Sequence, residues 1–148
     1  LAGVVAAFDF FPHENTLVID AGTCITYDFV DKNGHYLGGS IAPGMKMRLQ
    51  AMHHFTAKLP LVEQKPLRKF IGNDTVSALR TGGQMGIVME ISGFIETYNK
   101  TFGKINTILT GGDTGFLAKH LEKPIFVKNN LILHGLNQIL NYNVQLLE

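Results

Sequence analysis

The argument about the fold begins with the stretch Leu17–Val30, which has the sequence LVIDAGTCITYDFV. An apolar run from Leu17 ends at Asp20 and is followed by the short turn Ala21-Gly22-Thr23. Apolar and polar residues then alternate from Ile25 to Val30, which is the period of a half-buried β-strand. We therefore predict two consecutive strands, Leu17–Asp20 and Ile25–Val30, joined by a tight turn that contains a glycine.

Turn and helix signals surround this stretch. The next four residues, Asp31–Gly34, include Asn-Gly, the strongest hairpin dipeptide, so we expect a third strand over Tyr36–Ile41 and a meander of three. Pro43-Gly44 is expected to open a helix with the proline in its first turn, because proline is favoured there. On the N-terminal side, Leu1–Phe11 has the composition of a helix end that Pro12 stops.

The middle of the chain predicts a loop and a long helix. Phe55–Phe70 has two prolines and no hydrophobic period, so we expect an exposed loop. Asn73 or Asp74 can cap the longest helix, since both side chains accept hydrogen bonds from free N–H groups. Its apolar face is predicted to consist of Val76, Leu79, Ile87, Ile91, Phe94 and Tyr98.

Three glycines, Gly82, Gly83 and Gly86, lie inside this helix. Each costs roughly 1 kcal/mol relative to alanine, so we predict close packing of another element against them. A dinucleotide-binding motif is rejected, because such glycines follow a strand rather than lie within a helix.

The last third alternates strands and helices. Its predicted elements are a strand over Ile105–Leu109, a turn at Thr110-Gly111-Gly112, a helix capped by Asp113 over Gly115–Leu121, a strand over Ile125–Val127 and a helix over Leu131–Leu140. The whole pattern predicts an α/β fold with about five strands and helices beside them.

Composition excludes several classes of protein. The 148 residues are 45% hydrophobic with a net charge of +1, and no basic stripe is present to follow a phosphate backbone, so we expect no nucleic-acid partner. The one cysteine, Cys24, excludes a disulfide framework and indicates a reducing compartment, from which we expect a cytoplasmic protein. The apolar stretch Leu1–Phe8 is shorter than the ~20 residues of a membrane span, so no membrane partner is expected. Because the chain starts at Leu1 in mid-pattern, we expect it to be part of a longer one.

The turn after Asp20 can bind phosphate. Gly22 allows a ligand close to the backbone, the Thr23 hydroxyl can donate a hydrogen bond to phosphate oxygens, and Asp20 can hold a cation. An ordinary hairpin turn explains these residues equally well. The stretches Gly38–Gly44 and Thr110–Asp113 have the same strand–glycine–helix form, with phosphate binding at a helix N-terminus or simple turn chemistry as the alternatives.

Other candidate residues carry weaker signals. The pair His53-His54 lacks a third ligand at zinc-like spacing and is expected to be solvated. Cys24 is expected to be a small strand residue rather than a nucleophile.

Taken in order, the motifs are more specific than any one alone. The chain resembles type III pantothenate kinases in LVIDAGTxxTxD from Leu17, GGxIxPG from Gly38, TAxLP from Thr56, GNDT from Gly72, TGGD from Thr110 and LxGL from Leu133. The resemblance implies the two-lobed fold of the actin, hexokinase and Hsp70 superfamily, in which each lobe is an RNase-H-like mixed sheet flanked by helices. It also implies a homodimer that transfers the γ-phosphate of ATP to pantothenate, with Mg²⁺ and a monovalent cation, K⁺ or NH₄⁺.

The resemblance also implies roles for residues. Asp20 corresponds to the aspartate that binds the monovalent cation, and Gly22 and Thr23 lie at the ATP phosphates. Thr75 corresponds to a residue that contacts pantothenate. Gly111 and Gly112 correspond more loosely to a turn near the nucleoside of ATP.

Two motifs of the family are absent from this chain. They are the Asp-x-Gly-Asn phosphate loop of the first lobe and a Gly-x-Asp-Arg motif whose aspartate is the general base, expected just before Leu1. We therefore expect residues 1–148 to be the second lobe, with no catalytic base of its own. The alternative function is a family relative without kinase activity that binds nucleotide as an accessory or regulatory protein. A sugar or acetate kinase of the same superfamily fits less well, because Thr56–Pro60 and Thr75 argue against it.

Overall fold

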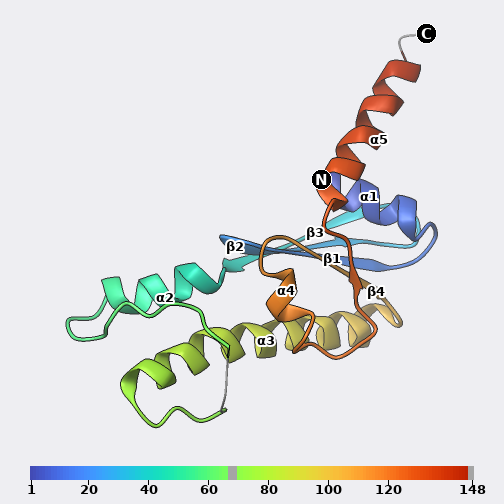
Figure 1. The fold of residues 1–148 in the computed structure, drawn as a ribbon. Helices are drawn as coiled ribbons and strands as arrows, with labels where there is room; N and C mark the ends of the chain where they lie inside the picture. Colours follow the sequence, from blue (N-terminus) through green and yellow to red (C-terminus); the bar gives the residue numbers. More distant parts are fainter. Residues whose placement is uncertain (67–69, 147–148) are drawn as a thin grey trace.

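The computed structural model describes residues 1–66 and 70–146 and shows one mixed sheet with helices on both faces (Figure 1). The strands are β1 (Thr16–Ala21), β2 (Cys24–Val30), β3 (Tyr36–Pro43), β4 (Asn106–Thr110) and β5 (Phe126–Val127). The helices are α1 (Ala2–Phe10), α2 (Met45–His54), α3 (Thr75–Phe102), α4 (Thr114–Leu117) and α5 (Leu131–Gln145). The predicted α/β class, the five strands and the meander are confirmed.

The order of strands in the sheet is β3-β2-β1-β4-β5. Strands β1, β2 and β3 are antiparallel neighbours, whereas β1, β4 and β5 run parallel. Asp20 near the end of β1 is in register with Thr26 of β2 and with Thr110 at the end of β4. Because β1 and β4 end at the same edge of the sheet, the turns that follow them are brought together there.

Alternation along β1 and β2 assigns each side chain to one of two cores. Leu17 and Ile19 are fully buried in the core on the α3 face, whereas Val18 is buried on the α1 face. Figure 1 shows α1 and α5 on one side of the sheet and α3 with α4 on the other. On the α3 face the ring of Tyr27 stacks on Phe94 with centroids 4.0 Å apart.

Helix α3 begins at a capping box. The Asp74 carboxylate accepts a hydrogen bond from the Ser77 backbone N–H at 2.8 Å, and the Ser77 hydroxyl accepts one from the Asp74 N–H at 3.2 Å. Ile87 and Ile91 are buried against the sheet as predicted, but Val76 is 40% exposed. The expectation for Val76 was wrong because this first turn of α3 extends beyond the sheet that covers the later turns (Figure 1).

The close-packing prediction for the helix glycines holds at one position. A Cβ at Gly83 would lie 2.7 Å from Cδ2 of Leu49, so α2 crosses α3 at this glycine. A Cβ at Gly82 or Gly86 would meet no described atom within 4 Å. The prediction was therefore wrong for those two glycines within this chain.

Several element boundaries differ from the predictions. Pro43 is the last residue of β3, paired with Cys24, and not part of the first turn of α2. Asp113 precedes α4 but makes no side-chain cap hydrogen bond. Helix α5 runs to Gln145, five residues beyond its predicted end. The loop predicted over 55–70 is mostly exposed, although Val62 is buried, and its residues 67–69 lie outside the described part of the chain.

Among the described residues, none of the helices combines the length and the apolar composition that a membrane span requires.

Candidate functional site

The β1–β2 turn, the start of α2 and the β4–α4 turn meet at one end of the sheet. The Gly44 N–H donates to the carbonyl oxygen of Thr23 at 3.0 Å, which fixes the start of α2 beside the β1–β2 turn. The Asp113 N–H donates to the carbonyl oxygen of Ala21 at 3.0 Å, which fixes the β4–α4 turn from the other side. Segments far apart in the sequence thus form one backbone-lined cluster, which we call the turn cluster.

Glycine is required where these turns touch. A Cβ at Gly44 would lie 2.0 Å from the carbonyl oxygen of Gly22. Gly111 has a positive φ of 95°, and its Cβ would lie 2.6 Å from Oδ1 of Asp20 and 2.4 Å from the carbonyl oxygen of Ala21. Any side chain at either glycine would separate the turns, because backbone atoms fill the space. At Gly111 the positive φ, which L residues rarely adopt, adds to this requirement.

Gly22, Thr23 and Gly112 face the open side of the turn cluster. A Cβ at Gly112 would meet no described atom within 4 Å, and one at Gly22 would meet only the Cys24 carbonyl oxygen at 4.0 Å. Thr23 is exposed. Four of the residues predicted for ATP therefore lie together at the turn cluster: Gly22, Thr23, Gly111 and Gly112.

The second glycine motif is only partly at this site. Gly38 and Gly39 lie within β3 and pair with Phe29 and Asp28, so they do not belong to the turn before α2. Only the Gly44 end of the predicted stretch Gly38–Gly44 reaches the turn cluster. The first two glycines were misassigned because a glycine pair inside a strand has the same sequence appearance as one in a turn.

Asp20 lies where a carboxylate is disfavoured. Burial, together with the negative charge of Asp28, raises the pKa of Asp20 above its usual value. The Asp28 carboxylate accepts hydrogen bonds from the hydroxyl of Tyr36 at 2.6 Å and of Thr26 at 3.2 Å, which hold it in place. Burial also raises the pKa of Asp113.

The carboxylates of Asp20, Asp28 and Asp113 offer oxygen ligands, which hard cations prefer. A bound cation near Asp20 would offset both the lost hydration and the repulsion from Asp28. Among residues 1–66 and 70–146, no three His, Cys, Asp or Glu side chains gather as a metal site would require. Any cation at Asp20 would therefore need backbone carbonyl or ligand oxygens as well.

Thr75 is not part of the turn cluster. It is exposed in the first turn of α3, which Figure 1 shows beside the far end of α2. The hydrogen bonds of the cap come from Asp74 and Ser77. The alternative that Thr75 serves the cap is therefore not needed to explain how α3 begins.

An ion pair that sequence reasoning missed ties α2 to α3. Arg48 of α2 donates to Oε2 of Glu90 on α3 at 2.6 Å and to the carbonyl oxygen of Pro43 at 2.8 Å. The Tyr27 hydroxyl donates to Oε1 of Glu90 at 2.9 Å, and burial followed by this bond raises the pKa of Tyr27. The only sequence signal was Glu90 itself, a glutamate within the long helix. Its presence there does not identify its partner.

The remaining candidates have ordinary surroundings. Nδ1 of His53 hydrogen-bonds to the carbonyl oxygen of Leu59 at 2.7 Å, and His54 is exposed beside Phe55. Cys24 is half-buried as a free thiol at the start of β2.

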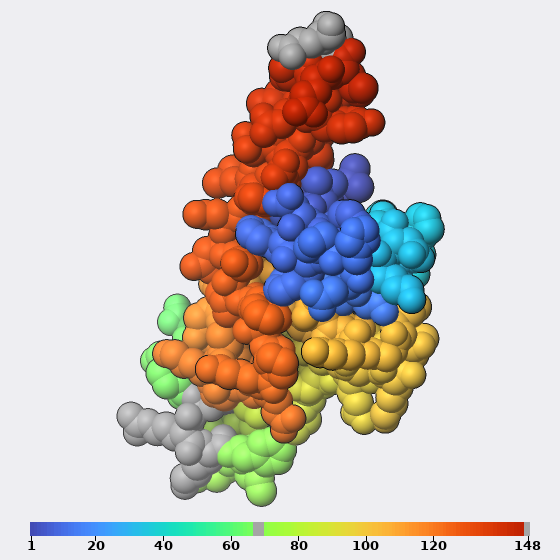
Figure 2. Space-filling model, turned by 90° about the vertical axis from the view of Figure 1, so that its right-hand side faces the viewer, coloured from blue at the N-terminus to red at the C-terminus, as the bar shows by residue number. Residues whose placement is uncertain are grey.

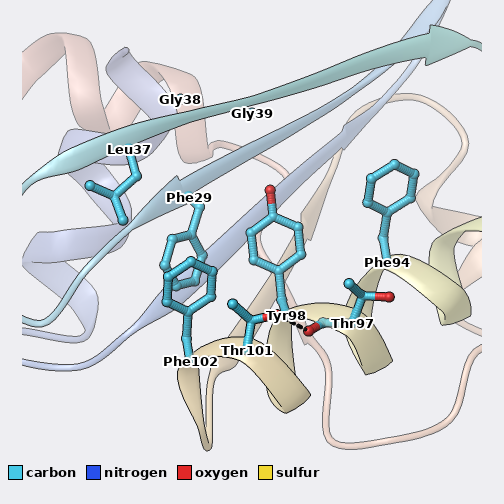
Figure 3. Close-up of a pocket in the computed structure, with 9 residues that line it drawn as sticks. All are labelled: Phe29, Leu37, Gly38, Gly39, Phe94, Thr97, Tyr98, Thr101 and Phe102. Atoms are coloured by element: carbon cyan, nitrogen blue, oxygen red, sulfur yellow. Dashed lines mark hydrogen bonds between the residues drawn. The ribbon is translucent and has the colours of Figure 1, made fainter.

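A further hollow beside the sheet lies away from the turn cluster. A shallow groove of about 380 Å³ opens between the beginning of β3 and the last turns of α3 (Figure 3). It is lined by Phe29, Leu37, Gly38, Gly39, Phe94, Thr97, Tyr98, Thr101 and Phe102. Apart from Gly38 and Gly39 of the predicted glycine stretch, the groove is lined by none of the predicted site residues, and it lies toward the opposite end of β3 from the turn cluster.

Comparisons with known proteins agree with the motifs. The sequence profile of the family "Type III pantothenate kinase" matches residues 1–97. Two relatives described as type III pantothenate kinases come from Flavobacterium johnsoniae, 48% identical over 134 residues, and Bacteroides fragilis, 49% identical over 143 residues. These matches cover 90% and 97% of this chain but only 55% and 59% of the relatives, so the chain spans somewhat more than half of their length.

One solved structure has a similar fold. It is the crystal structure of a conserved protein from Campylobacter jejuni assigned to the Baf family of transcriptional activators, with 27% sequence identity and a TM-score of 0.67. The match covers 97% of this chain and 65% of that one. With two thirds of its residues matched by the family profile and its motifs gathered on the predicted fold, the chain belongs to the type III pantothenate kinase family.

Proposed function

We propose that the protein, in the full length of its relatives, phosphorylates pantothenate with ATP to give 4′-phosphopantothenate, the first step of coenzyme A biosynthesis. This chain forms the second lobe of that enzyme, and the first lobe with its phosphate loop lies outside it. The observation that carries the proposal is the turn cluster, because it brings three loops with phosphate-binding composition to one edge of the sheet. Family membership supplies the reaction.

In this proposal the turn cluster holds ATP through backbone and hydroxyl donors. Thr23 and Gly22 contact the phosphates, and Gly111 and Gly112 form the turn near the nucleoside. Phosphoryl transfer depends mainly on positioning and electrostatic stabilisation, so fixed N–H groups at an open turn suit this task. The N-terminus of α2 adds a favourable dipole beside the same turn.

Asp20 holds the monovalent cation, K⁺ or NH₄⁺, in the proposed enzyme. The raised pKa of Asp20 supports this role, because a half-buried carboxylate beside another negative charge gains from a positive neighbour. A bound cation supplies charge that offsets the phosphates, and Mg²⁺ arrives with ATP. Thr75 hydrogen-bonds to pantothenate, and the base that accepts the proton of the pantothenate hydroxyl lies outside this chain. The proposed enzyme is a cytoplasmic homodimer.

A second candidate function is a nucleotide-binding accessory or regulatory protein without kinase activity. The description of the Campylobacter jejuni structure as a Baf family transcriptional activator favours it. In that case the turn cluster would bind nucleotide without turnover.

One experiment separates the two candidates. A chimera joins residues 1–148 to the part of the Flavobacterium johnsoniae relative that lies outside its 134-residue match, which restores full length. ADP release is coupled to a dehydrogenase assay with ATP, Mg²⁺, K⁺ and pantothenate, and nucleotide binding is measured by calorimetry. Pantothenate-dependent ADP release supports the kinase, whereas ATP binding without ADP release supports the accessory protein and overturns the kinase proposal.

Matched variants test the site in the same chimera. Thr23→Val removes a hydroxyl at the turn cluster and should raise KM for ATP about two- to twelve-fold, the value of one neutral hydrogen bond. Thr97→Val is the control, because its hydroxyl donates within α3 to the carbonyl oxygen of Gly93 at 2.8 Å. Equal KM values for ATP in the two variants would contradict the role of Thr23.

A further inference from the structure

Three elements of the fold meet at one carboxylate, that of Glu90 on α3. Its Oε2 accepts a hydrogen bond from the Arg48 guanidinium of α2 at 2.6 Å, and its Oε1 accepts one from the Tyr27 hydroxyl of β2 at 2.9 Å. Each oxygen of the carboxylate is therefore bound by a different element. We call these three side chains the Glu90 joint.

The Glu90 joint is largely shielded from water. Tyr27 is fully buried, and the side chains of Arg48 and Glu90 are only 22% and 27% exposed. Burial and the bond to Glu90 raise the pKa of Tyr27, so its hydroxyl stays protonated and remains a donor. Charge-assisted hydrogen bonds are stronger than neutral ones, and shielded pairs are weakened less by salt than exposed pairs are.

Arg48 also connects the Glu90 joint to the turn cluster. Its Nε donates to the carbonyl oxygen of Pro43 at 2.8 Å, and Pro43 is the residue that ends β3 just before α2. The next residue, Gly44, donates its N–H to the carbonyl oxygen of Thr23 at 3.0 Å. A short path therefore leads from α3 through Arg48 and the start of α2 to the turn that contains Thr23.

Apolar packing already holds α2 against α3. Leu49 of α2 is buried against Gly83, and Met45 is buried in the same core. A partly buried ion pair adds little to net stability, since the lost hydration offsets much of the attraction. It does fix direction, because a planar guanidinium that meets both Pro43 and Glu90 restricts how the start of α2 can lie.

We propose that the three side chains of the Glu90 joint are positioning residues for ATP: they hold the start of α2 against the β1–β2 turn and so keep Thr23 in place for the phosphates. The inference goes with the proposed function, on which it rests, because Thr23 and Gly22 contact the phosphates there. The start of α2 already touches this turn, since a Cβ at Gly44 would collide with the carbonyl oxygen of Gly22. Loosening the joint therefore lets α2 move only away from the turn.

The test pairs two glutamates of the same helix. Glu90→Gln keeps the size of the side chain but removes the charge that binds Arg48. The control, Glu96→Gln, removes the charge of an ion pair with Lys100, whose two side chains are 66% and 74% exposed on the last turns of α3, yellow-orange in Figure 2. KM and kcat are measured in the chimera described above, ATP binding by calorimetry, and amide hydrogen exchange in residues 1–148 by NMR.

In the chimera, Glu90→Gln should raise KM for ATP about three- to tenfold and weaken ATP binding by the same factor, the usual effect of a residue that acts through others. The kcat and the KM for pantothenate should stay within about twofold, because Thr75 lies outside the turn cluster. Glu96→Gln should leave all of these values unchanged. A role in stability alone would lower the melting temperature without this selective change in KM for ATP.

Hydrogen exchange tests the joint without ATP. In residues 1–148, Glu90→Gln should speed exchange of the Gly44 amide at least about fivefold relative to the amides of β1, which pair on both sides and report global unfolding. Glu96→Gln should leave this ratio unchanged. If Glu90 serves only stability, the amides of Gly44 and of β1 should be accelerated equally, which would overturn the inference.

Tyr27→Phe is a second variant that leaves the ring to stack on Phe94 and removes only the hydroxyl. It should raise KM for ATP in the same direction but by less than Glu90→Gln does, because Arg48 keeps its partner. Equal ATP affinity in Glu90→Gln and Glu96→Gln would overturn this inference and leave the proposed function standing. An unmutated chimera that binds no ATP would overturn the proposed function, whereas the Gly44 exchange would still decide whether the joint holds α2.

Discussion

At the scale of single residues, Asp20 combines an electrostatic cost to folding with a proposed function. Its carboxylate loses hydration near the end of β1 and faces the charge of Asp28, and both effects raise its pKa. When the pKa of an acid is higher in the folded state than in the unfolded state, the ionised group destabilises the fold. Asp20 therefore opposes folding at neutral pH in the chain without a cation.

The variant Asp20→Asn should raise the melting temperature of the chain at pH 7. The gain should be complete above the folded-state pKa, should shrink as the pH falls through it, and should vanish below 3.8, the ordinary value, where Asp20 is protonated in both states. Thermal melts between pH 3 and 8 measure this difference. Asp31→Asn is the control and should instead lower the melting temperature at pH 7. The pKa of Asp31 is lowered mainly by the hydrogen bond that its carboxylate accepts from the His35 backbone N–H, so its ionised form stabilises the fold.

The same variant should weaken activation by K⁺ in the full-length chimera. Charge-assisted contacts are worth roughly 1.5–3 kcal/mol, so the K⁺ concentration for half-activation should rise at least about tenfold. The K⁺ concentration for half-activation is measured by following the rate of ADP release as K⁺ is titrated. If Asp20→Asn stabilises the chain and leaves the K⁺ curve unchanged, Asp20 is a half-buried strand residue without a cation.

Thr75 offers a test of pantothenate recognition separate from ATP binding. Thr75→Val in the chimera should raise KM for pantothenate about two- to twelve-fold and leave KM for ATP unchanged, because one neutral hydrogen bond is lost. The melting temperature should hardly change, since Asp74 and Ser77 make the cap. A drop in melting temperature with both KM values unchanged would assign Thr75 to the helix start instead.

At the scale of elements, α3 is built around one crossing with α2. Leu49 packs on Gly83, and the Arg48–Glu90 ion pair lies farther along the same two helices. Of the three clustered glycines, only Gly83 meets a close neighbour among the residues that the structure describes. The other two lower the helix propensity of α3 without a contact to compensate.

Gly82→Ala and Gly83→Ala should therefore differ in their effect on stability. Gly82→Ala gains helix propensity of about 1 kcal/mol and should raise the melting temperature of the chain by roughly 2–4 °C. Gly83→Ala puts a methyl group 2.7 Å from Leu49 and should fall below Gly82→Ala in the same melts. Equal melting of both variants would show that α2 moves away from α3 without cost.

At the scale of the whole molecule, the proposed mechanism divides the work between two parts of the protein. The turn cluster of this chain binds the phosphates of ATP, and the catalytic base lies outside the chain. The turn cluster is open on one side, and the chain spans 55–59% of its two cited relatives. In the proposed enzyme, the part of the protein outside the chain completes this site.

Residues 1–148 alone should therefore show no pantothenate-dependent ADP release under conditions in which the chimera turns over. The physical reason is that positioning of the acceptor and proton removal both require groups beyond the chain. The coupled assay at equal protein concentrations makes the comparison. Turnover by residues 1–148 would show that the base lies within them, and the catalytic assignment would then move to this lobe.

Most of the secondary structure follows from local sequence. The alternation in Ile25–Val30, the Asn33-Gly34 turn and the Asp74 cap depend on neighbours a few residues away, and all three are confirmed. Motif order was also sufficient to identify the family, which the profile match confirms. The roles of Asp20, Thr23 and Thr75 remain predictions.

Tertiary contacts determined what local patterns could not. Whether Val76 is buried depends on where the sheet ends, and whether a glycine is crowded depends on which helix crosses it, as Gly83 and Gly82 show. The partners of Glu90 lie 42 and 63 residues away in the sequence, and no periodicity encodes such pairs. The sequence by itself specified the elements and the family, because propensity, turn chemistry and motif spacing are local. Only the tertiary structure assembled the turn cluster, because packing depends on contacts between segments that are distant in the chain.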